Sequence, residues 1–304
     1  MTVLSHGLTW IDLEFLGRAN AIATAVIQSP AGVALIDPGP TTCLQTLDRA
    51  LQRQGLGLAD VRQILLTHIH LDHAGATGTI VRDYPDVAVY VHERGAPHVA
   101  DPTRLLDSAT RLYGADMDRL WGEVAPVAQS NLVVLRGGER VEAGGRVLDV
   151  AYTPGHASHH VSYFDASSGV AFVGDTAGVC INGGYVLPPT PPPDIDLEAW
   201  RTSAGTIEAW SPGTLFLTHF GPVGHVQPHL QSLLEHLEEM AGWVNTSLSE
   251  PGTDEERSRG FANRVRQRMA RQMTEHQASA YKVAAPAEQL WFGLARYWRK
   301  RGVA

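Results

Sequence analysis

Four potential metal ligands stand within residues 68–73, where the chain reads HIHLDH. They occupy positions one, three, five and six, a spacing that suits a tight loop better than a helix. In such a loop the four side chains can form two groups that point in different directions. His68 and His70 can then serve one metal ion. Asp72 and His73 can serve a second. Imidazole together with carboxylate suits zinc, iron, manganese or nickel, which spacing alone does not separate.

Three further polar residues come directly after apolar runs, where a strand leaves the core: His156, Asp175 and His219. Each metal ion needs more ligands than the 68–73 segment offers, so these residues are candidate ligands as well. The glycine before His156 permits a sharp turn at that position. Taken alone, a histidine after a strand is more often a hydrogen-bonded or surface residue. The assignment of His156 and His219 as candidate ligands therefore depends on the dense cluster at 68–73.

The composition excludes several classes of protein. Fourteen histidines stand against only two cysteines, Cys43 and Cys180, which argues against a disulfide scaffold or a thiolate zinc finger. No apolar run of about 18 residues is present, and the first residues lack a signal-peptide pattern, so we expect a cytoplasmic protein without membrane contact. The net charge of −8 argues against nucleic-acid binding. The oligomeric state stays open, with a homodimer as one option.

The elements that must position these ligands are strands alternating with helices over the first 228 residues. Segments 32–37 and 64–68, each an apolar strand followed by polar residues, are echoed in the same order by 169–175 and 215–219. The echo predicts a duplicated half with polar residues at matching strand ends. Such strand ends can converge on one cleft.

Two further segments are expected to shape a pocket beside the ligands. Residues 103–127 read as helical, and residues 188–193 hold five prolines in six positions, which excludes a helix there. Helices are also predicted at 229–243, 253–276 and 286–301. The second of these helices carries an apolar stripe with a period of four, Phe261, Val265, Met269 and Met273.

The same helix carries six arginines between residues 257 and 271 without an intervening acid. Its simplest interpretation is a solvated helix face. The alternative is an anion site for a substrate tail such as coenzyme A, glutathione or a phosphate.

The seven candidate ligands resemble, in residue type and order, those of the metallo-β-lactamase superfamily. The resemblance covers roughly residues 8 to 225 and implies an α/β fold, an αββα sandwich with the metals at one edge between two mixed sheets. We therefore predict a metallo-β-lactamase-like catalytic domain over 1–228 and a small helical C-terminal appendage over 229–304. The nine remaining histidines receive ordinary roles, and His159 and His160 are interpreted as peripheral.

The resemblance also implies two metal sites joined by one shared ligand: His68, His70 and His156 for the first, Asp72, His73 and His219 for the second, and Asp175 as the bridge. Two divalent cations, with zinc expected and iron or manganese as alternatives, would hold a bridging hydroxide that attacks a carbonyl or phosphoryl centre. Asp72 is the candidate catalytic residue, as a proton shuttle. Asp37 is a candidate partner that orients a ligand histidine through its second ring nitrogen.

Differences between this sequence and the well-described branches of the superfamily narrow the branch to which the chain could belong. True β-lactamases of this fold lack a bridging aspartate at the position of Asp175. Quorum-quenching lactonases carry a tyrosine where Gly178 stands, and glyoxalase II enzymes continue Gly-Asp-Thr with Leu-Phe rather than Ala177-Gly178. The short segment between Asp175 and His219 excludes the RNA-processing members with a large insertion. The chain resembles an uncharacterised metallo-hydrolase branch.

We therefore predict a dinuclear metal-dependent hydrolase that acts on a small acyl substrate, a thioester or an ester. One alternative is a lactonase, which would give one product where thioester cleavage gives two. Another alternative is a non-catalytic ligand-binding sensor on the same fold. Loss of ligands normally marks such sensors, and all seven candidate ligands are present here.

Overall fold

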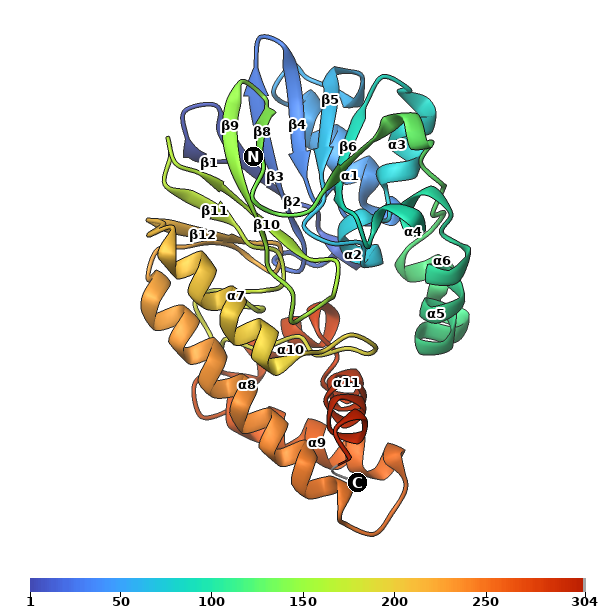
Figure 1. Cartoon of the computed structure of the whole chain (residues 1–304), viewed down its shortest axis with the longest axis vertical. Helices are drawn as coiled ribbons and strands as arrows, with labels where there is room; N and C mark the ends of the chain where they lie inside the picture. The colour runs from blue at the N-terminus through green and yellow to red at the C-terminus, as the bar shows by residue number, and fades with distance from the viewer. Residues whose placement is uncertain (303–304) are drawn as a thin grey trace.

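The structure is a computed structural model of the chain and describes residues 1–302, apart from the side chain of residue 276. The last two residues of the predicted appendage and the side chain of His276 therefore lie outside the described residues. Two sheets face each other, and helices cover their outer faces (Figure 1). The predicted αββα fold class is confirmed.

Within residues 1–302 both sheets are mixed. The first sheet has the strand order β1 (Thr2–Ser5), β2 (Leu8–Asp12), β3 (Ala23–Ser29), β4 (Gly32–Ile36), β5 (Val61–Leu65), β6 (Ala88–His92) and β7 (Leu132–Leu135). The second has the order β13 (Gly221–Val223), β12 (Thr214–Leu217), β11 (Val170–Phe172), β10 (Val161–Asp165), β9 (Arg146–Tyr152) and β8 (Arg140–Ala143). Strands β4 to β7 run parallel, as do β11 and β12. The two segments echoed in the sequence thus form one parallel strand pair in each sheet.

Strand β4 shows how a two-residue period fills two cores at once. Val33 and Leu35 pack among the helices outside the first sheet. Ala34 and Ile36 pack between the two sheets. Successive side chains of a strand point to opposite faces, so a strand buried on both sides reads as one continuous apolar run.

The first sheet is covered by α1 (Leu44–Gln52), α3 (Thr77–Asp83) and α4 (Ala96–Ala100), and the second by α7 (Leu197–Ala209) and the first half of α8 (Val226–Leu248). Short 3-10 turns lie at Phe15–Gly17, Thr41–Cys43, Leu58–Asp60, Gly114–Asp116 and Gln129–Asn131. The predicted helix over 103–127 is wrong as one element, because the chain reverses at Gly114, where φ is +54°, and separates α5 (Thr103–Tyr113) from α6 (Met117–Leu120).

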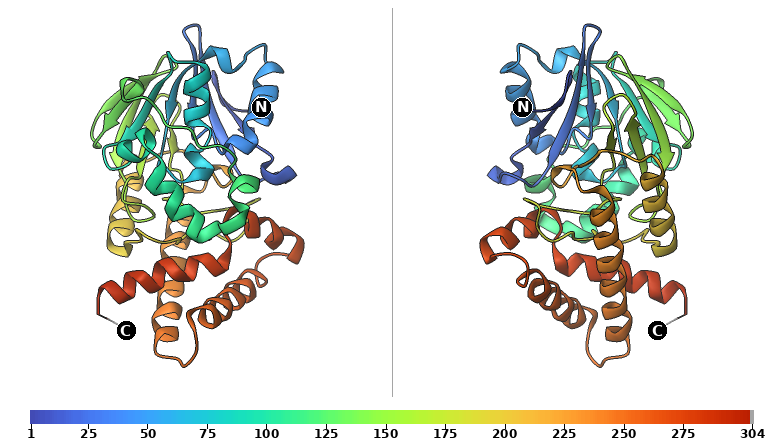
Figure 2. Two further views of the ribbon diagram at one scale, coloured as in Figure 1. Left: turned by 90° about the vertical axis from the view of Figure 1, so that its right-hand side faces the viewer. Right: turned by 90° about the vertical axis from the view of Figure 1, so that its left-hand side faces the viewer.

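The C-terminal helices form an appendage beneath the sandwich, with α11 (Ala287–Lys300) running across below α5 (Figure 2). The predicted helix over 253–276 ends earlier, as α9 (Asp254–Met269). A further helix, α10 (Glu275–Ala284), was not predicted. It begins where the Thr274 hydroxyl accepts a hydrogen bond from the Gln277 backbone N–H, a capping box that starts a new helix.

The predicted apolar stripe is confirmed for Phe261, Val265 and Met269, which are buried in the appendage core, whereas Met273 lies beyond the end of α9 and is only partly buried against that core. Helix α8 begins at Val226 and continues without a break into the appendage, so a domain boundary after residue 228 stays a prediction. No helix within the described residues is both long enough and apolar enough to cross a membrane.

Candidate metal centre

All seven predicted ligands meet at one edge of the sandwich, because the strands that precede them end there. They come from the segment after β5 (His68, His70), the single helical turn α2 at Leu71–Ala74 (Asp72, His73), the turn after β9 (His156), the end of β11 (Asp175) and the end of β12 (His219). The loop predicted for all of 68–73 is wrong for its second half. The backbone N–H groups of His73 and Ala74 both donate to the His70 carbonyl, which winds this stretch into a helical turn.

Three imidazole nitrogens converge on one point. His70 Nδ1 lies 3.0 Å from His68 Nε2 and 2.9 Å from His156 Nε2. Nitrogens that share one tetrahedral zinc ion at about 2.0–2.1 Å each would be roughly 3.3 Å apart, so this spacing suits a common ion. The turn that delivers His156 depends on Gly155, whose φ is +140° and whose added Cβ would lie 2.4 Å from the Trp200 Cα.

A second group forms around the carboxylate of Asp175. Its Oδ1 lies 3.3 Å from His73 Nε2 and 3.6 Å from His219 Nε2. Its Oδ2 faces the first group, 3.4 Å from His156 Nε2. Asp72 Oδ2 completes the second group at 3.2 Å from His219 Nε2. One carboxylate thus presents one oxygen to each group, as a bridging ligand must.

Buried atoms without partners show that the second group fits a cation. His73 Nε2, His219 Nε2 and Asp175 Oδ1 are buried and make no hydrogen bond among the described residues. An unsatisfied buried polar atom costs about 1–3 kcal/mol, so three of them at one point call for a shared partner. The donor set of imidazole nitrogens and carboxylate oxygens suits divalent ions such as zinc, iron or manganese without distinguishing among them.

In His156 and His219 the second ring nitrogen is held by an outer partner that fixes how the ring points. His156 Nδ1 donates to the Pro189 carbonyl at 2.8 Å, and His219 Nδ1 donates to the Ala21 carbonyl at 2.6 Å. With Nδ1 protonated, the Nε2 lone pair of each ring faces the centre. Such outer contacts orient metal ligands and raise their basicity.

Asp37 plays this part for His73, whose Nδ1 lies 2.8 Å from Asp37 Oδ2. The predicted contact between Asp37 and a ligand histidine is confirmed. The Asp37 carboxylate is fully buried and also accepts hydrogen bonds from the hydroxyls of Thr67 and Thr218, at 2.7 and 2.9 Å. These threonines are the matching residues of the two echoed segments, so the repeat builds a symmetrical support for one carboxylate.

The protonation states of His70 and Asp72 suit cation binding at neutral pH. Burial, together with the neighbouring His156, lowers the pKa of His70 to about 4. Burial alone would raise the pKa of Asp72, but the nearby rings of His73 and His219 outweigh it and lower that pKa to about 2. The ring of His70 is therefore neutral and the carboxylate of Asp72 ionised, which leaves lone pairs free to bind a cation.

We expect Asp37→Asn to weaken binding of one metal ion by about 10–100-fold, because the amide nitrogen cannot accept the His73 Nδ1–H. Titration with zinc against a competing chelator would measure this change. Asp165→Asn is the matched control, since Asp165 is equally buried and accepts from Ser167, Ser168 and Arg146 away from the centre. Equal losses of affinity in the two variants would contradict an orienting role for Asp37.

His160 is a functional residue that sequence reasoning missed, and its interpretation as peripheral is wrong. Its ring is buried and stacks on that of His68, with centroids 5.0 Å apart. Its Nε2 accepts from the backbone N–H of Asp175 at 3.3 Å, while its Nδ1 contacts the hydroxyls of Thr153 and Thr176. His160 therefore holds the backbone that carries the Asp175 carboxylate.

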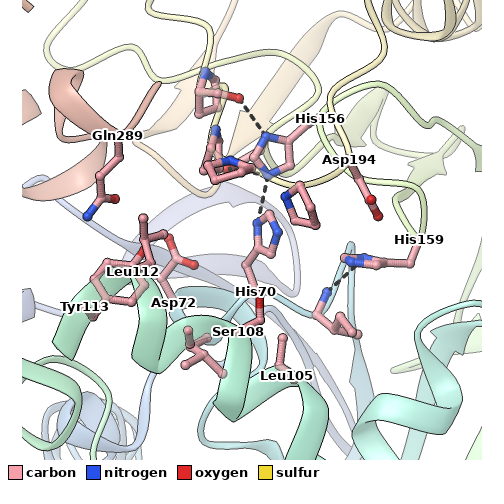
Figure 3. Close-up of a pocket in the computed structure, with 18 of the residues that line it drawn as sticks. His70, Asp72, Leu105, Ser108, Leu112, Tyr113, His156, His159, Asp194 and Gln289 are labelled. Carbon is pink, nitrogen blue, oxygen red and sulfur yellow. Dashed lines mark hydrogen bonds and ion pairs between the residues drawn. The ribbon is translucent and has the colours of Figure 1, made fainter. Parts of the chain in front are cut away.

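A pocket of about 330 Å³ opens onto the centre (Figure 3). Helix α5 forms one wall, and the proline-rich segment 188–193 forms another, as predicted. His159 also lines the pocket, so its interpretation as peripheral is wrong as well. A third wall, from Ala284 to Leu290 in the C-terminal appendage, was not predicted, and Figure 3 shows Gln289 directed into the space.

Comparisons with known proteins agree with this architecture. The chain is 30% identical over 177 residues to the metallo-beta-lactamase fold-containing protein ST1585 of Sulfurisphaera tokodaii, covering 56% of this chain and 66% of that protein. It is 32% identical over 165 residues to a hydroxyacylglutathione hydrolase of Synechococcus sp., covering 54% of this chain and 52% of that protein. The chain thus spans only about half to two thirds of these curated relatives.

A solved structure shows the same fold over almost the whole chain. The metallo-beta-lactamase family protein TTHA1429 from Thermus thermophilus superposes with a TM-score of 0.74, covers 99% of this chain and 95% of its own, and is 23% identical. The sequence profile of the metallo-beta-lactamase superfamily matches residues 17–219, a range that holds all seven residues of the candidate centre. Since this match spans well over half of the chain, the chain belongs to the metallo-beta-lactamase superfamily.

Proposed function

We propose that the chain is a dinuclear metal-dependent hydrolase that cleaves a small acyl substrate, a thioester or an ester. The observation that carries the proposal is the Asp175 carboxylate, with one oxygen toward each group of imidazole nitrogens beneath an open pocket. When bound, a pair of divalent ions supplies Lewis acidity and an activated water near neutral pH. The relatives named hydroxyacylglutathione hydrolase support an acyl substrate.

The chain's own residues have separate roles in the proposed reaction. The outer partners of His73, His156 and His219 hold these three rings in position for binding a cation. Asp72 is the more exposed carboxylate of the centre, with 21% of its side chain accessible against 5% for Asp175. It also lines the pocket, so it is placed to take a proton and pass it to the departing group.

The pocket favours a small molecule over a macromolecule. Its volume of about 330 Å³ lies at the lower end of the usual 300–1,000 Å³ for ligand sites. The lactonase alternative receives less support. Gly178, where that branch carries tyrosine, has a φ of +80°, and a Cβ there would lie 2.7 Å from Leu233 Cδ1.

The test combines metal analysis with a substrate panel. Protein purified without chelator, or reconstituted with zinc, iron(II) or manganese, should bind close to two equivalents and hydrolyse thioesters or esters. Removal of the metal should abolish turnover, and returning it should restore turnover. Less than one equivalent after reconstitution would contradict the dinuclear centre. Two equivalents with turnover of lactones alone would establish the lactonase, and two equivalents with ligand binding but no turnover would establish the sensor.

A further inference from the structure

We propose that the mouth of the pocket holds an anion subsite, formed by Arg94 and Arg104, that binds a carboxylate or phosphate on the leaving group of the acyl substrate. The proposal rests on the proposed hydrolase function and specifies its substrate class. It starts from the two kinds of side chain, apolar and cationic, that line this one pocket together with His70, Asp72, His156 and Asp175.

The apolar part is suited to an acyl chain. Leu105, Ala109 and Leu112 of α5 line it, together with Trp121, and Leu290 of α11 lies on the wall that the appendage contributes. Figure 3 shows Leu105 and Leu112 on the helix that faces His70 and Asp72. If the carbonyl carbon of the substrate lies above the metal centre, these apolar side chains would therefore cover its acyl chain.

Arg104 belongs to the same pocket-facing stripe of α5. Arg104, Ser108 and Leu112 follow one another at intervals of four, which places them on one face of a helix, and all three line the pocket. Arg94 lines the pocket from the segment after β6, with its guanidinium 5.8 Å from the centroid of the Tyr152 ring. Two cations from separate elements thus border one opening.

Neither guanidinium has a carboxylate partner among the described residues, in contrast to neighbouring arginines. Arg82 pairs with Glu123 at 2.6 Å, Arg119 with Asp116 at 2.9 Å and Arg136 with Glu93 at 2.8 Å. Two acidic side chains nearby, Asp194 in the pocket wall and Asp101 beside Arg104, accept hydrogen bonds from other residues. Asp194 accepts from the Ser158 hydroxyl at 2.5 Å. Asp101 accepts from the backbone N–H and the hydroxyl of Thr103.

Two histidines add to the donor capacity of this opening. His98 and His159 both line the pocket, so four nitrogen-bearing side chains are available to an anion there. Charge-assisted hydrogen bonds to carboxylate or phosphate are shorter and stronger than neutral ones, and the arginine fork matches both groups. An anionic tail that extends from the centre to the mouth would meet this cluster.

The arginine-rich segment 257–271 is a weaker candidate for the same role. Arg257 pairs with Asp254 at 3.0 Å, Arg266 with Glu288 at 2.8 Å and Arg268 with Glu239 at 3.2 Å. Helix α9 contributes no residue to the pocket wall. Three of the six arginines are thus paired within the appendage and away from the pocket, and the role of this segment stays a prediction.

The reaction balances without a further reactant. Water adds across the acyl carbon–sulfur bond of a thioester, the hydroxyl going to the carbonyl carbon and a proton to the departing sulfur. The products are a carboxylic acid and a thiol that retains its anionic tail. The proposed subsite binds that tail before and during cleavage and takes no part in the bond change.

The test compares two hexanoyl thioesters that differ only in the tail, one of 3-mercaptopropionate and one of 3-mercaptopropionamide. Arg104→Gln and Arg94→Gln should each raise KM for the carboxylate about 10-fold and leave KM for the amide unchanged. The preference for the carboxylate should fade at high salt. Arg111→Gln is the matched control, because Arg111 is an exposed arginine of α5 that does not line the pocket. Equal effects on both thioesters, or an equal effect of Arg111→Gln, would overturn the subsite.

A binding measurement keeps the subsite testable if neither thioester is cleaved. The thioethers 3-(hexylthio)propanoate and 3-(hexylthio)propanamide carry the same two tails without a scissile bond. Calorimetry should show tighter binding of the propanoate, and Arg104→Gln should remove the difference. A difference that survives in Arg104→Gln would place the carboxylate on the metal ions and overturn the subsite. Failure of turnover with the binding difference intact would overturn the hydrolase and retain the subsite.

Discussion

Replacing Asp175 by alanine is expected to remove most of the bound metal and to lower turnover of acyl substrates by at least about 10³-fold. The Asp175 side chain is 5% exposed and, of the seven ligands, is the one that faces both imidazole groups, at 3.3 Å from His73 Nε2 and 3.4 Å from His156 Nε2. Of the seven, Asp72 would be left as the one carboxylate for two divalent cations. Lewis-acid stabilisation is worth several kcal/mol, and each 1.36 kcal/mol is tenfold in rate.

Metal content and thermal stability should change together in this variant. A ligand that binds only the folded state stabilises it by about 4 kcal/mol at 1,000 times its Kd, so chelation should lower the Tm of the parent protein. In Asp175→Ala the chelator should cause little further decrease in Tm, because most of the metal is already lost. Elemental analysis and thermal unfolding with and without chelator measure both quantities.

Asp194→Asn is the control for this experiment. Asp194 lines the same pocket, but its carboxylate accepts from the Ser158 hydroxyl rather than facing the imidazole groups. We expect this variant to keep its metal and its response to chelator. Two equivalents of metal and near-parental turnover in Asp175→Ala would show that the carboxylate does not bridge, and the proposed centre would then be wrong.

The parts of the fold that the sequence predicts well are those with a local signal. Strand β4 lies within the predicted segment 32–37, because a strand buried on both faces reads as one continuous apolar run. The segment 68–73 is equally local, since four of its six residues are potential ligands. Its partners His156, Asp175 and His219 could be selected because each follows an apolar run.

The parts that were missed depend on contacts between distant segments. His160 acts through the backbone of Asp175 and the hydroxyl of Thr176, which lie on the far side of β10 and β11 in the chain. The pocket wall at 284–290 likewise forms only because the appendage folds back under the sandwich. A local signal was available for α10, the Thr274 to Gln277 capping box, and for His160 the only hint was its place directly before a fully buried strand.

The appendage is also connected to the metal centre, through the proline-rich segment. Helix α11 packs so closely on this segment that a Cβ on Gly293 would lie 2.2 Å from the Thr190 carbonyl oxygen. The Thr190 hydroxyl donates to the Leu290 carbonyl at 3.0 Å. One residue earlier, the Pro189 carbonyl accepts from His156 Nδ1 at 2.8 Å. A shift of this segment would therefore alter the support of one metal ligand.

We expect Gly293→Ala to weaken binding of one metal ion about 10-fold, at the low end of the effect of losing an outer partner. The new methyl group meets backbone atoms of Thr190 and Pro191, so either the proline-rich segment or α11 must move, at an overpacking cost of about 1–3 kcal/mol. Zinc titration against a chelator resolves the weakened site, and thermal unfolding of the metal-free protein measures the strain separately.

Gly260→Ala separates this effect from a general effect of changing a glycine in the appendage. Gly260 lies within α9 with no atom within 4 Å of an added Cβ, so alanine there should stabilise the helix by about 0.5–1 kcal/mol and leave zinc affinity unchanged. If Gly293→Ala lowers the Tm while both metal ions bind as tightly as in the parent protein, the segment holds His156 independently of α11. If zinc affinity falls as expected, the helices outside the matched range 17–219 contribute to the metal centre as well as to the pocket wall.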